Sequence, residues 1–301
     1  MKPVIQYIKE YFRQVNKTVL LTVSCFTAIL IFINYQYGLD GRIRNNSFAV
    51  KLILWYSVFA AAFLIPYVIA LPYTKEKYPA NRRFFLLAAT APFIFALKLT
   101  LELPFTFSAD RNWNNYWEHV VYWPSLAAII IVILLVIWYF NDRDQLFYGI
   151  KTKNINWKPY WLMLLIMLPL IALASTQPDF LAVYPKLRSV EGVFNDPHTT
   201  TWHKLLFELS YGTDFITIEF FFRGFLILAF ARYAGKDAIL PMACFYCTIH
   251  FGKPAGECIS SYFGGLILGI VVYNTRSVFG GLIVHLGIAW LMEAGGYLGS
   301  A

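Results

Sequence analysis

Residues 211–228 read YGTDFITIEFFFRGFLIL, and this stretch decides which kind of fold the chain adopts. It is apolar enough for a membrane helix, yet it contains Asp214, Glu219 and Arg223. A charged side chain at the centre of a membrane helix costs about 2.5–3.5 kcal/mol on insertion scales, so such residues face partners inside a helical bundle. Glu219 and Arg223 are four residues apart, which places them on one side of an α-helix and allows them to pair. The stretch therefore predicts a polar site within a membrane bundle.

The composition of the whole chain also indicates a membrane protein. Of its 301 residues, 58% are hydrophobic and 14% are charged, whereas a soluble domain carries about 25% charged residues. The apolar runs are continuous rather than alternating, which excludes a transmembrane β-barrel. The net charge of +8 comes mostly from Lys and Arg in the short segments between apolar runs. We therefore expect no nucleic-acid partner, and instead a protein oriented in the membrane by its basic loops.

Nine apolar segments approach the length of about 20 residues that a membrane helix needs. The seventh is short and has Pro241 near its start, so we expect an all-α polytopic transmembrane bundle of about eight to nine helices. The charged N-terminal stretch before the first segment predicts an amphipathic helix at the membrane interface rather than a signal peptide. The segments lie at residues 18–36, 49–73, 84–101, 122–140, 159–176, 205–232, 238–251, 257–273 and 277–293.

A polar stretch at residues 177–204 divides the predicted bundle into two regions. It contains three prolines and an Asn-Asp-Pro turn signal. We expect a transmembrane region at 1–176, an extramembrane loop at 177–204 and a functional transmembrane core at 205–301. With the N-terminus inside, the inner segments hold 15 Lys and Arg residues and the outer segments hold 8. This asymmetry predicts a cytoplasmic N-terminus in a plasma (inner) membrane.

The functional core contains residues whose chemistry suits hydrolysis. His250 and His285 follow the charged stretch in later apolar segments, and Glu257 follows His250 by seven residues. A carboxylate with a histidine can act as a general base toward water. A second histidine can stabilise an oxyanion, and Arg223 can hold Glu219 ionised and oriented. These are the parts of a peptide-bond hydrolase.

Other chemistries remain open for the same residues. Histidine and carboxylate side chains also bind zinc, but the His-Glu-x-x-His spacing that makes a zinc site specific is absent from the sequence. We therefore expect no cofactor, and rank a divalent metal such as zinc below metal-free chemistry. Alternatively, Glu219 and Arg223 form a structural ion pair while the histidines hydrogen-bond between helices. The buried charges can also line the path of a transported ion.

Two of the four cysteines form a Cys-x-x-Cys sequence within ACFYCTIH, residues 243–250. In a soluble protein this spacing indicates redox or metal-binding chemistry. Here it lies in an apolar segment and no second pair occurs in the sequence. The pattern therefore predicts that these cysteines are buried and structural.

Four separated motifs occur in an order that resembles one known family. They are EFFFRGFLI from Glu219, a histidine at the end of the next apolar segment, FGGLILG from Phe263, and a terminal segment with a further histidine. This pattern covers about residues 200–293 and resembles the CPBP family, the CAAX prenyl protease and bacteriocin-processing intramembrane proteases, also called the ABI family. The resemblance implies an intramembrane endopeptidase, with membrane lipids and a membrane-bound or lipidated peptide or protein as its partners.

The first two family motifs are carried over position by position. Glu-Glu-x-x-x-Arg matches Glu219 and Arg223, with Ile218 in place of the first Glu, which is usually assigned as the water-activating base. Phe-x-x-x-His matches His250, with Tyr246 in place of the Phe. The resemblance therefore assigns Glu219, Arg223 and His250 to the site while leaving the usual base position apolar.

The third family motif, His-x-x-x-Asn, matches His285, with Ala289 in place of the Asn thought to help hold the oxyanion. We expect Glu219 to activate water with His250, and His285 to help stabilise the oxyanion. Asp214 and Glu257 are the other candidates for the missing carboxylate. The alternative is a family member that lacks catalysis and acts as a membrane scaffold or binding partner.

Overall fold

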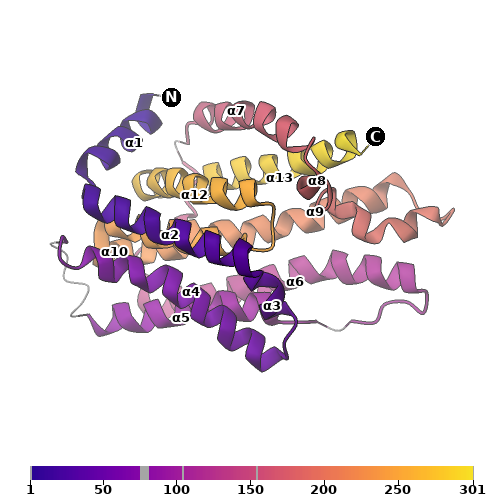
Figure 1. Cartoon of the computed structure of the whole chain (residues 1–301), viewed down its shortest axis with the longest axis horizontal. Coiled ribbons are helices and arrows are strands. Elements are labelled where there is room, and N and C mark those ends of the chain that lie inside the picture. The colour runs from indigo at the N-terminus through magenta and orange to yellow at the C-terminus, as the bar shows by residue number, and fades with distance from the viewer. Residues whose placement is uncertain (1, 75–80, 104, 154, 301) are drawn as a thin grey trace. The chain divides into compact units, whose positions relative to one another are not determined.

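A computed structural model of the chain (Figure 1) describes residues 2–74, 81–103, 105–153 and 155–300. Every regular element in these ranges is a helix, which confirms the predicted all-α fold. Two basic residues of the orientation count, Lys75 and Lys77, lie outside the described residues. The helices are α1 (Lys2–Gln14), α2 (Lys17–Tyr37), α3 (Leu39–Arg44), α4 (Phe48–Ala70), α5 (Arg82–Thr100), α6 (Arg111–Asn141), η2 (Phe147–Gly149), α7 (Lys158–Ala174), α8 (Pro178–Leu181), η3 (Lys186–Asn195), α9 (Thr201–Ile218), η4 (Glu219–Ala229), α10 (Ala231–Ala234), η5 (Gly235–Ala238), α11 (Ile239–Thr248), α12 (Ala255–Thr275) and α13 (Phe279–Gly299).

Each of the nine predicted apolar segments corresponds to helical structure. Within the described ranges, six helices are long and apolar enough to cross a membrane: α2, α4, α5, α6, α12 and α13. The fifth segment gives α7, which has 17 residues, and the sixth is shared mainly by α9 and the π-helix η4. The chain is therefore a polytopic helical membrane protein.

Local sequence signals account for the ends of α2. The helix begins after Asn16, whose side chain accepts hydrogen bonds from the backbone N–H groups of Thr18 and Val19 at 2.9 and 3.2 Å. This is the usual role of an asparagine at the N-cap of a helix. The helix ends at Gly38, whose φ of 61° lies in the left-handed region that glycine adopts without steric cost. The turn into α3 therefore needs a glycine at this position.

Contacts between residues divide the chain into two compact units, which are described separately. Each unit contains segments from before and after residues 177–204. These units are defined by contacts and not by function, so the predicted regions 1–176, 177–204 and 205–301 stay a prediction. The first unit comprises Met1–Leu101, Phe140–Lys151 and Phe221–Val278, and the second comprises Glu102–Tyr139, Thr152–Phe220 and Phe279–Ala301.

The first unit is organised around α11, a helix whose ten residues are all buried. It packs against α2, α4 and α12. The ring of Phe245 lies 4.9 Å from that of Phe59 and 5.2 Å from that of Phe222, as measured between centroids. Ten helical residues are too few to cross about 30 Å of hydrocarbon. The burial of α11 means that protein, rather than lipid, surrounds this short segment.

The second unit packs α13 against α7 and α9. Glycines on α13 allow this close approach. A Cβ atom added at Gly280 would overlap the ring of Tyr160 on α7, and one added at Gly287 would lie 2.6 Å from Leu164 on the same helix. Glycines seven residues apart lie on one face of a helix, so the α7-facing side of α13 is fixed by small residues.

The polar stretch predicted as a loop forms two short helices, α8 and η3. The start of η3 is capped by a residue from α13. The carboxylate of Glu293, which is 3% exposed, accepts hydrogen bonds from the backbone N–H groups of Lys186 at 2.8 Å and Leu187 at 3.4 Å. These contacts satisfy backbone donors that the first turn of a helix leaves unpaired. A carboxylate distant in sequence therefore orders this stretch.

Candidate active site

A hydrogen bond joins two of the predicted site residues within the second unit. The Nδ1 atom of His285, on α13, lies 3.0 Å from Oε1 of Glu219, the first residue of η4. The side chain of Glu219 is fully buried and that of His285 is 13% exposed. When the carboxylate is ionised it only accepts hydrogen bonds, and the Nδ1–H group of His285 is then the donor to Glu219. In the neutral ring, Nε2 then carries the lone pair.

Two neighbouring residues fix the geometry of this pair. A Cβ atom added at Gly281, one turn before His285, would overlap Oε2 of Glu219. The carboxylate therefore occupies space that any larger residue at Gly281 would fill. The ring of Phe215 on α9 lies edge-on to the imidazole, with the ring centroids 4.9 Å apart, an arrangement that aromatic pairs favour. Helices α9 and α13 thus orient both members of the pair.

Glu219 lies where the helix changes type. Helix α9 ends at Ile218, and the π-helix η4 runs from Glu219 to Ala229. π-Helical turns form i→i+5 hydrogen bonds, are rare, and occur frequently at functional sites. The expected pairing of Glu219 with Arg223 assumed α-helical spacing, whereas both residues lie in the π-helix. The pairing therefore stays a prediction. Apolar periodicity gave no signal for this change of helix type.

Within the first unit, Tyr246 contacts two other candidate residues. The guanidinium carbon of Arg223, which is fully buried, lies 3.9 Å from the centroid of the Tyr246 ring, as in a close cation–π contact. The Nδ1 atom of His250 lies 3.0 Å from the carbonyl oxygen of Tyr246, and the two rings meet edge to face at 4.8 Å. A Cβ atom at Gly265 would lie 2.9 Å from the same ring. Tyr246 thus supplies the ring that a Phe supplies in the family motif.

The contact with the carbonyl oxygen of Tyr246 also fixes which tautomer a neutral His250 ring adopts. A carbonyl oxygen only accepts, so Nδ1 of His250 carries a hydrogen and donates it to Tyr246. In the neutral ring, Nε2 of His250 then carries the lone pair. When the ring is protonated, both nitrogens become donors.

The turn that carries His250 is held by α2. The side-chain amide of Asn34 donates to the carbonyl oxygen of Phe251 at 2.9 Å, and the hydroxyl of Tyr35 donates to that of Lys253 at 2.7 Å. Asn34 is 2% exposed. Neither anchoring residue was predicted from the sequence. A signal was present, because Asn34 is a polar residue within the apolar segment 18–36.

The other two candidate carboxylates, Asp214 and Glu257, lie in different units from each other. Asp214 lies on α9 in the second unit and is partly exposed. Glu257 lies in the first turn of α12, and its Oε1 is 3.8 Å from Nζ of Lys253. At the two positions that depart from the family motifs, Ile218 is 6% exposed and Ala289 is 3% exposed. The family's Glu and Asn are thus replaced by buried apolar side chains.

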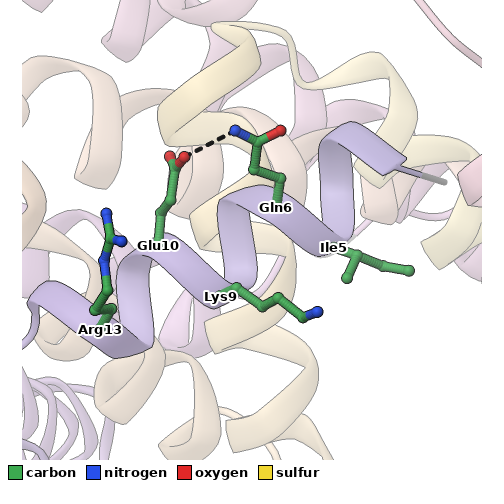
Figure 2. Close-up of a pocket in the computed structure, with 5 residues that line it drawn as sticks. All are labelled: Ile5, Gln6, Lys9, Glu10 and Arg13. Atoms are coloured by element: carbon green, nitrogen blue, oxygen red, sulfur yellow. Dashed lines mark hydrogen bonds between the residues drawn. The ribbon is translucent and has the colours of Figure 1, made fainter.

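Two cavities elsewhere in the described structure are lined by other residues. One, of about 610 Å³, lies along α1 and is lined by Ile5, Gln6, Lys9, Glu10 and Arg13 (Figure 2). Within it, the side-chain amide of Gln6 donates to Glu10 at 2.9 Å. The other, of about 490 Å³, is lined by polar residues at the start of α6. Neither cavity is lined by Glu219, His250 or His285.

Among the residues that the structure describes, no three or more His, Cys, Asp and Glu side chains are placed to hold a metal ion. The fold and the site define a polytopic membrane protein with a buried carboxylate–histidine pair. Residues 202–291 match the family described as type II CAAX prenyl endopeptidase Rce1-like. This match covers just under a third of the chain and confirms the predicted family resemblance for that part. No curated protein and no solved structure shows significant similarity to the chain.

Proposed function

We propose that the chain is an intramembrane endopeptidase that hydrolyses a peptide bond near the C-terminus of a lipidated or otherwise membrane-bound peptide. The family match supports endopeptidase activity at the level of the family. The observation that supports particular catalytic residues is the 3.0 Å hydrogen bond between His285 and the buried carboxylate of Glu219. A buried carboxylate paired with an imidazole suits general acid–base catalysis.

In the proposed reaction, His285 and Glu219 act together as the general base. The lone pair of Nε2 of His285 takes a proton from water while the water oxygen attacks the peptide carbonyl carbon. The carboxylate of Glu219 stabilises the imidazolium that forms. When the C–N bond breaks, the imidazolium returns the proton to the leaving nitrogen. This assignment gives His285 the proton transfer that the sequence suggested for Glu219 with His250.

His250 lies in the first unit, so the part in catalysis predicted for it from the sequence stays a prediction. Its Nδ1–H group is engaged by the carbonyl oxygen of Tyr246, so only the imidazolium has an Nε2–H group to donate. Arg223 is proposed to act through Tyr246, as a positioning residue that holds the ring beside His250. Asp214 and Glu257 remain further carboxylate candidates, although the Lys253 contact supports an ion-pair role for Glu257.

A second function is favoured by the two departures from the family motifs. Ile218 and Ala289 are buried apolar residues at positions where the family has a Glu and an Asn. A chain that had lost catalysis would keep the helices and act as a membrane scaffold or binding partner. The two proposals differ in one measurable property, which is turnover of a peptide by the purified protein.

The test is hydrolysis of a farnesylated CAAX-type peptide by the chain reconstituted in liposomes. The endopeptidase proposal predicts release of the C-terminal fragment, identified by its mass, at a rate proportional to protein. The expected chemistry is metal-free, so a chelator should leave this rate unchanged. Absence of release from farnesylated, geranylgeranylated and unmodified peptides, by protein that is folded by circular dichroism, would favour the scaffold.

We also propose that the N-terminus lies in the cytoplasm, on the opposite side of the plasma membrane from the connection between α2 and α4. The support is the asymmetry of 15 against 8 basic residues. Protease digestion of a tag fused to Met1 tests this orientation. In sealed vesicles with the cytoplasmic face inside, the tag should be protected, and digestion of the tag in intact vesicles would contradict the proposal.

A further inference from the structure

Two buried cysteines meet where α11 and α12 approach each other. The sulfur atoms of Cys247, in the last turn of α11, and Cys258, in the first turn of α12, lie 3.8 Å apart. Both residues are 0% exposed. Cys247 is the second cysteine of the Cys-x-x-Cys sequence, but the thiol that it contacts comes from the next helix. The sequence pattern therefore did not reveal this pair.

The two thiols are oriented toward each other's backbone. The Cys247 thiol donates to the carbonyl oxygen of Cys258 at 3.3 Å, and the Cys258 thiol donates to that of Cys247 at 3.6 Å. These reciprocal contacts hold the two side chains together at the two ends of the segment that connects α11 to α12. The connection between the two cysteines contains His250.

We propose that Cys247 and Cys258 form a reversible disulfide, and that this pair is a redox-modification site. A disulfide needs sulfur atoms about 2.05 Å apart, so the observed 3.8 Å must shorten by about 1.8 Å. Rotation of the two side chains with a small shift of the first turn of α12 supplies this movement. That turn has no side-chain cap on its N-terminus, because its N-cap residue is Pro254.

The proposed oxidant is a low-molecular-weight disulfide, which reaches one of the two buried sulfur atoms when the first turn of α12 moves. One cysteine, as its thiolate, attacks a sulfur of the oxidant, which forms a mixed disulfide and releases one thiol. The second cysteine, as its thiolate, then attacks the sulfur atom of the first cysteine in the mixed disulfide. This step forms the protein disulfide and releases the other half of the oxidant as a thiol. Overall, two protein thiols are oxidised to one disulfide, and one oxidant disulfide is reduced to two thiols. A reductant reverses the exchange.

Oxidation would act on the turn that carries His250. Both thiol-to-carbonyl hydrogen bonds are lost when the sulfur atoms join, and the ends of α11 and α12 are drawn together. Asn34 and Tyr35 hold the middle of the same turn from α2. The strain between these anchors and the new bond is expected to shift His250 relative to Tyr246. This consequence for catalysis rests on the proposed endopeptidase function, whereas formation of the disulfide does not.

The test uses the full chain in liposomes in a Cys25→Ser background, because Cys25 is the exposed cysteine among the four. After treatment with oxidised glutathione, the protein is denatured, its remaining thiols are alkylated, and its peptides are analysed by mass. We expect a Cys247–Cys258 cross-linked peptide that disappears on reduction. Cys258→Ser and Cys247→Ala should each abolish it, while Cys244→Ser, which changes another buried cysteine, should retain it.

Complete alkylation of Cys247 and Cys258 after oxidation would overturn the proposal, as would a cross-link to Cys244. Peptidase activity is measured on the same samples. Oxidation should lower the rate by about ten- to a hundredfold, the scale of a small misplacement of a catalytic group, and Cys258→Ser should be insensitive. If the reduced protein shows no turnover but the cross-link forms, the endopeptidase proposal fails and the redox site stands.

Discussion

His285 and Glu219 are separated by 66 residues in the sequence, and their side chains are joined by a hydrogen bond of 3.0 Å. The contact links α13 to the residue that directly follows α9. It gives the imidazole a fixed tautomer, because Nδ1 donates to the carboxylate and Nε2 carries the lone pair. A carboxylate that holds a histidine in one tautomer and orientation is a common arrangement in hydrolytic active sites.

Replacing Gly281 with alanine should disrupt this pair. The added Cβ would overlap Oε2 of Glu219, so the carboxylate must move away from α13 and from His285. We expect kcat to fall by about ten- to a hundredfold, with a cost in stability of about 1–3 kcal/mol from overpacking.

Gly264 provides the matched control for this substitution. A Cβ at Gly264, on α12, meets no atom within 4 Å. Gly264→Ala should therefore leave the rate unchanged, and raise helix stability by up to about 1 kcal/mol. A folded Gly281→Ala protein with the kcat of the parent would show that the Glu219–His285 contact has no part in turnover.

Removing the anchors of the His250 turn should weaken both stability and activity. Tyr35→Phe deletes the hydroxyl that donates to the carbonyl of Lys253, at a cost of about 0.5–1.5 kcal/mol. Asn34→Ala leaves the buried carbonyl of Phe251 without this donor and should cost about 1–3 kcal/mol. Thermal unfolding in detergent and the peptidase rate are the two measurements.

The control for the anchors is Tyr37→Phe, because Tyr37 lies on the same helix and is 56% exposed. This variant should behave like the parent protein. If Tyr35→Phe and Tyr37→Phe have equal unfolding temperatures and equal rates, α2 does not hold the turn in the way described.

Tyr246→Phe should preserve activity, since the family motif has Phe at this position and the ring that faces Arg223 is retained. Tyr246→Leu removes the ring and leaves the buried guanidinium without its cation–π contact, which is worth about 2 kcal/mol or more when desolvated. We expect a lower unfolding temperature and a lower peptidase rate for the leucine variant only. Loss of activity in a stable Tyr246→Phe protein would instead assign a catalytic role to the hydroxyl.

A pH-dependent contribution to stability is expected at Asp196, which lies in the stretch predicted to be extramembrane. The indole N–H of Trp113 donates to its carboxylate at 2.7 Å, and the backbone N–H of His198 donates at 2.8 Å. These donors lower the pKa of Asp196 below its ordinary value of 3.8. A depressed pKa stabilises the folded state above the unfolded-state pKa, and this stabilisation is lost as the pH falls through the folded-state pKa.

Trp113→Phe removes the indole donor and tests this linkage. The parent should have the higher unfolding temperature at pH 7, and the difference should shrink as the pH falls below 3.8 and through the lowered folded-state pKa of Asp196. Trp161→Phe, at a residue that is 60% exposed, is the control and should show no pH-dependent difference. A Trp113→Phe effect of the same size at both pH values would mean that ring packing, rather than the charge on Asp196, accounts for it.

The fold followed from apolar segments because membrane helices are specified by length and hydrophobicity. Helix type and short helices were harder to predict. The π-helix that begins at Glu219 runs through an almost uniformly apolar sequence, EFFFRGFLILA, in which no periodicity distinguishes it from an α-helix. The helices within 177–204 depend on contacts such as the cap from Glu293, which no local pattern encodes. The ten-residue α11 was recognised as short, and its complete burial explains the short length.

The residues of the candidate site were found through motifs, but their partners were not. Local spacing pointed from Glu219 to Arg223, whereas the structure joins Glu219 to His285 and places Arg223 against Tyr246. Sequence spacing reports neighbours within one helix, and it carries no information on which face of another helix lies opposite. The same limit concealed the Cys247–Cys258 contact and the role of Asn34.

The most direct test of the central claim is the rate of peptide hydrolysis after Glu219→Gln. Glutamine keeps an oxygen that accepts the hydrogen bond from His285 but removes the charge that stabilises the imidazolium. The account predicts a fall in kcat of about 10²–10⁴-fold with an unchanged unfolding temperature, whereas Glu191→Gln, at an exposed position, keeps the parent rate. A Glu219→Gln protein that hydrolyses the peptide at the parent rate would contradict the account.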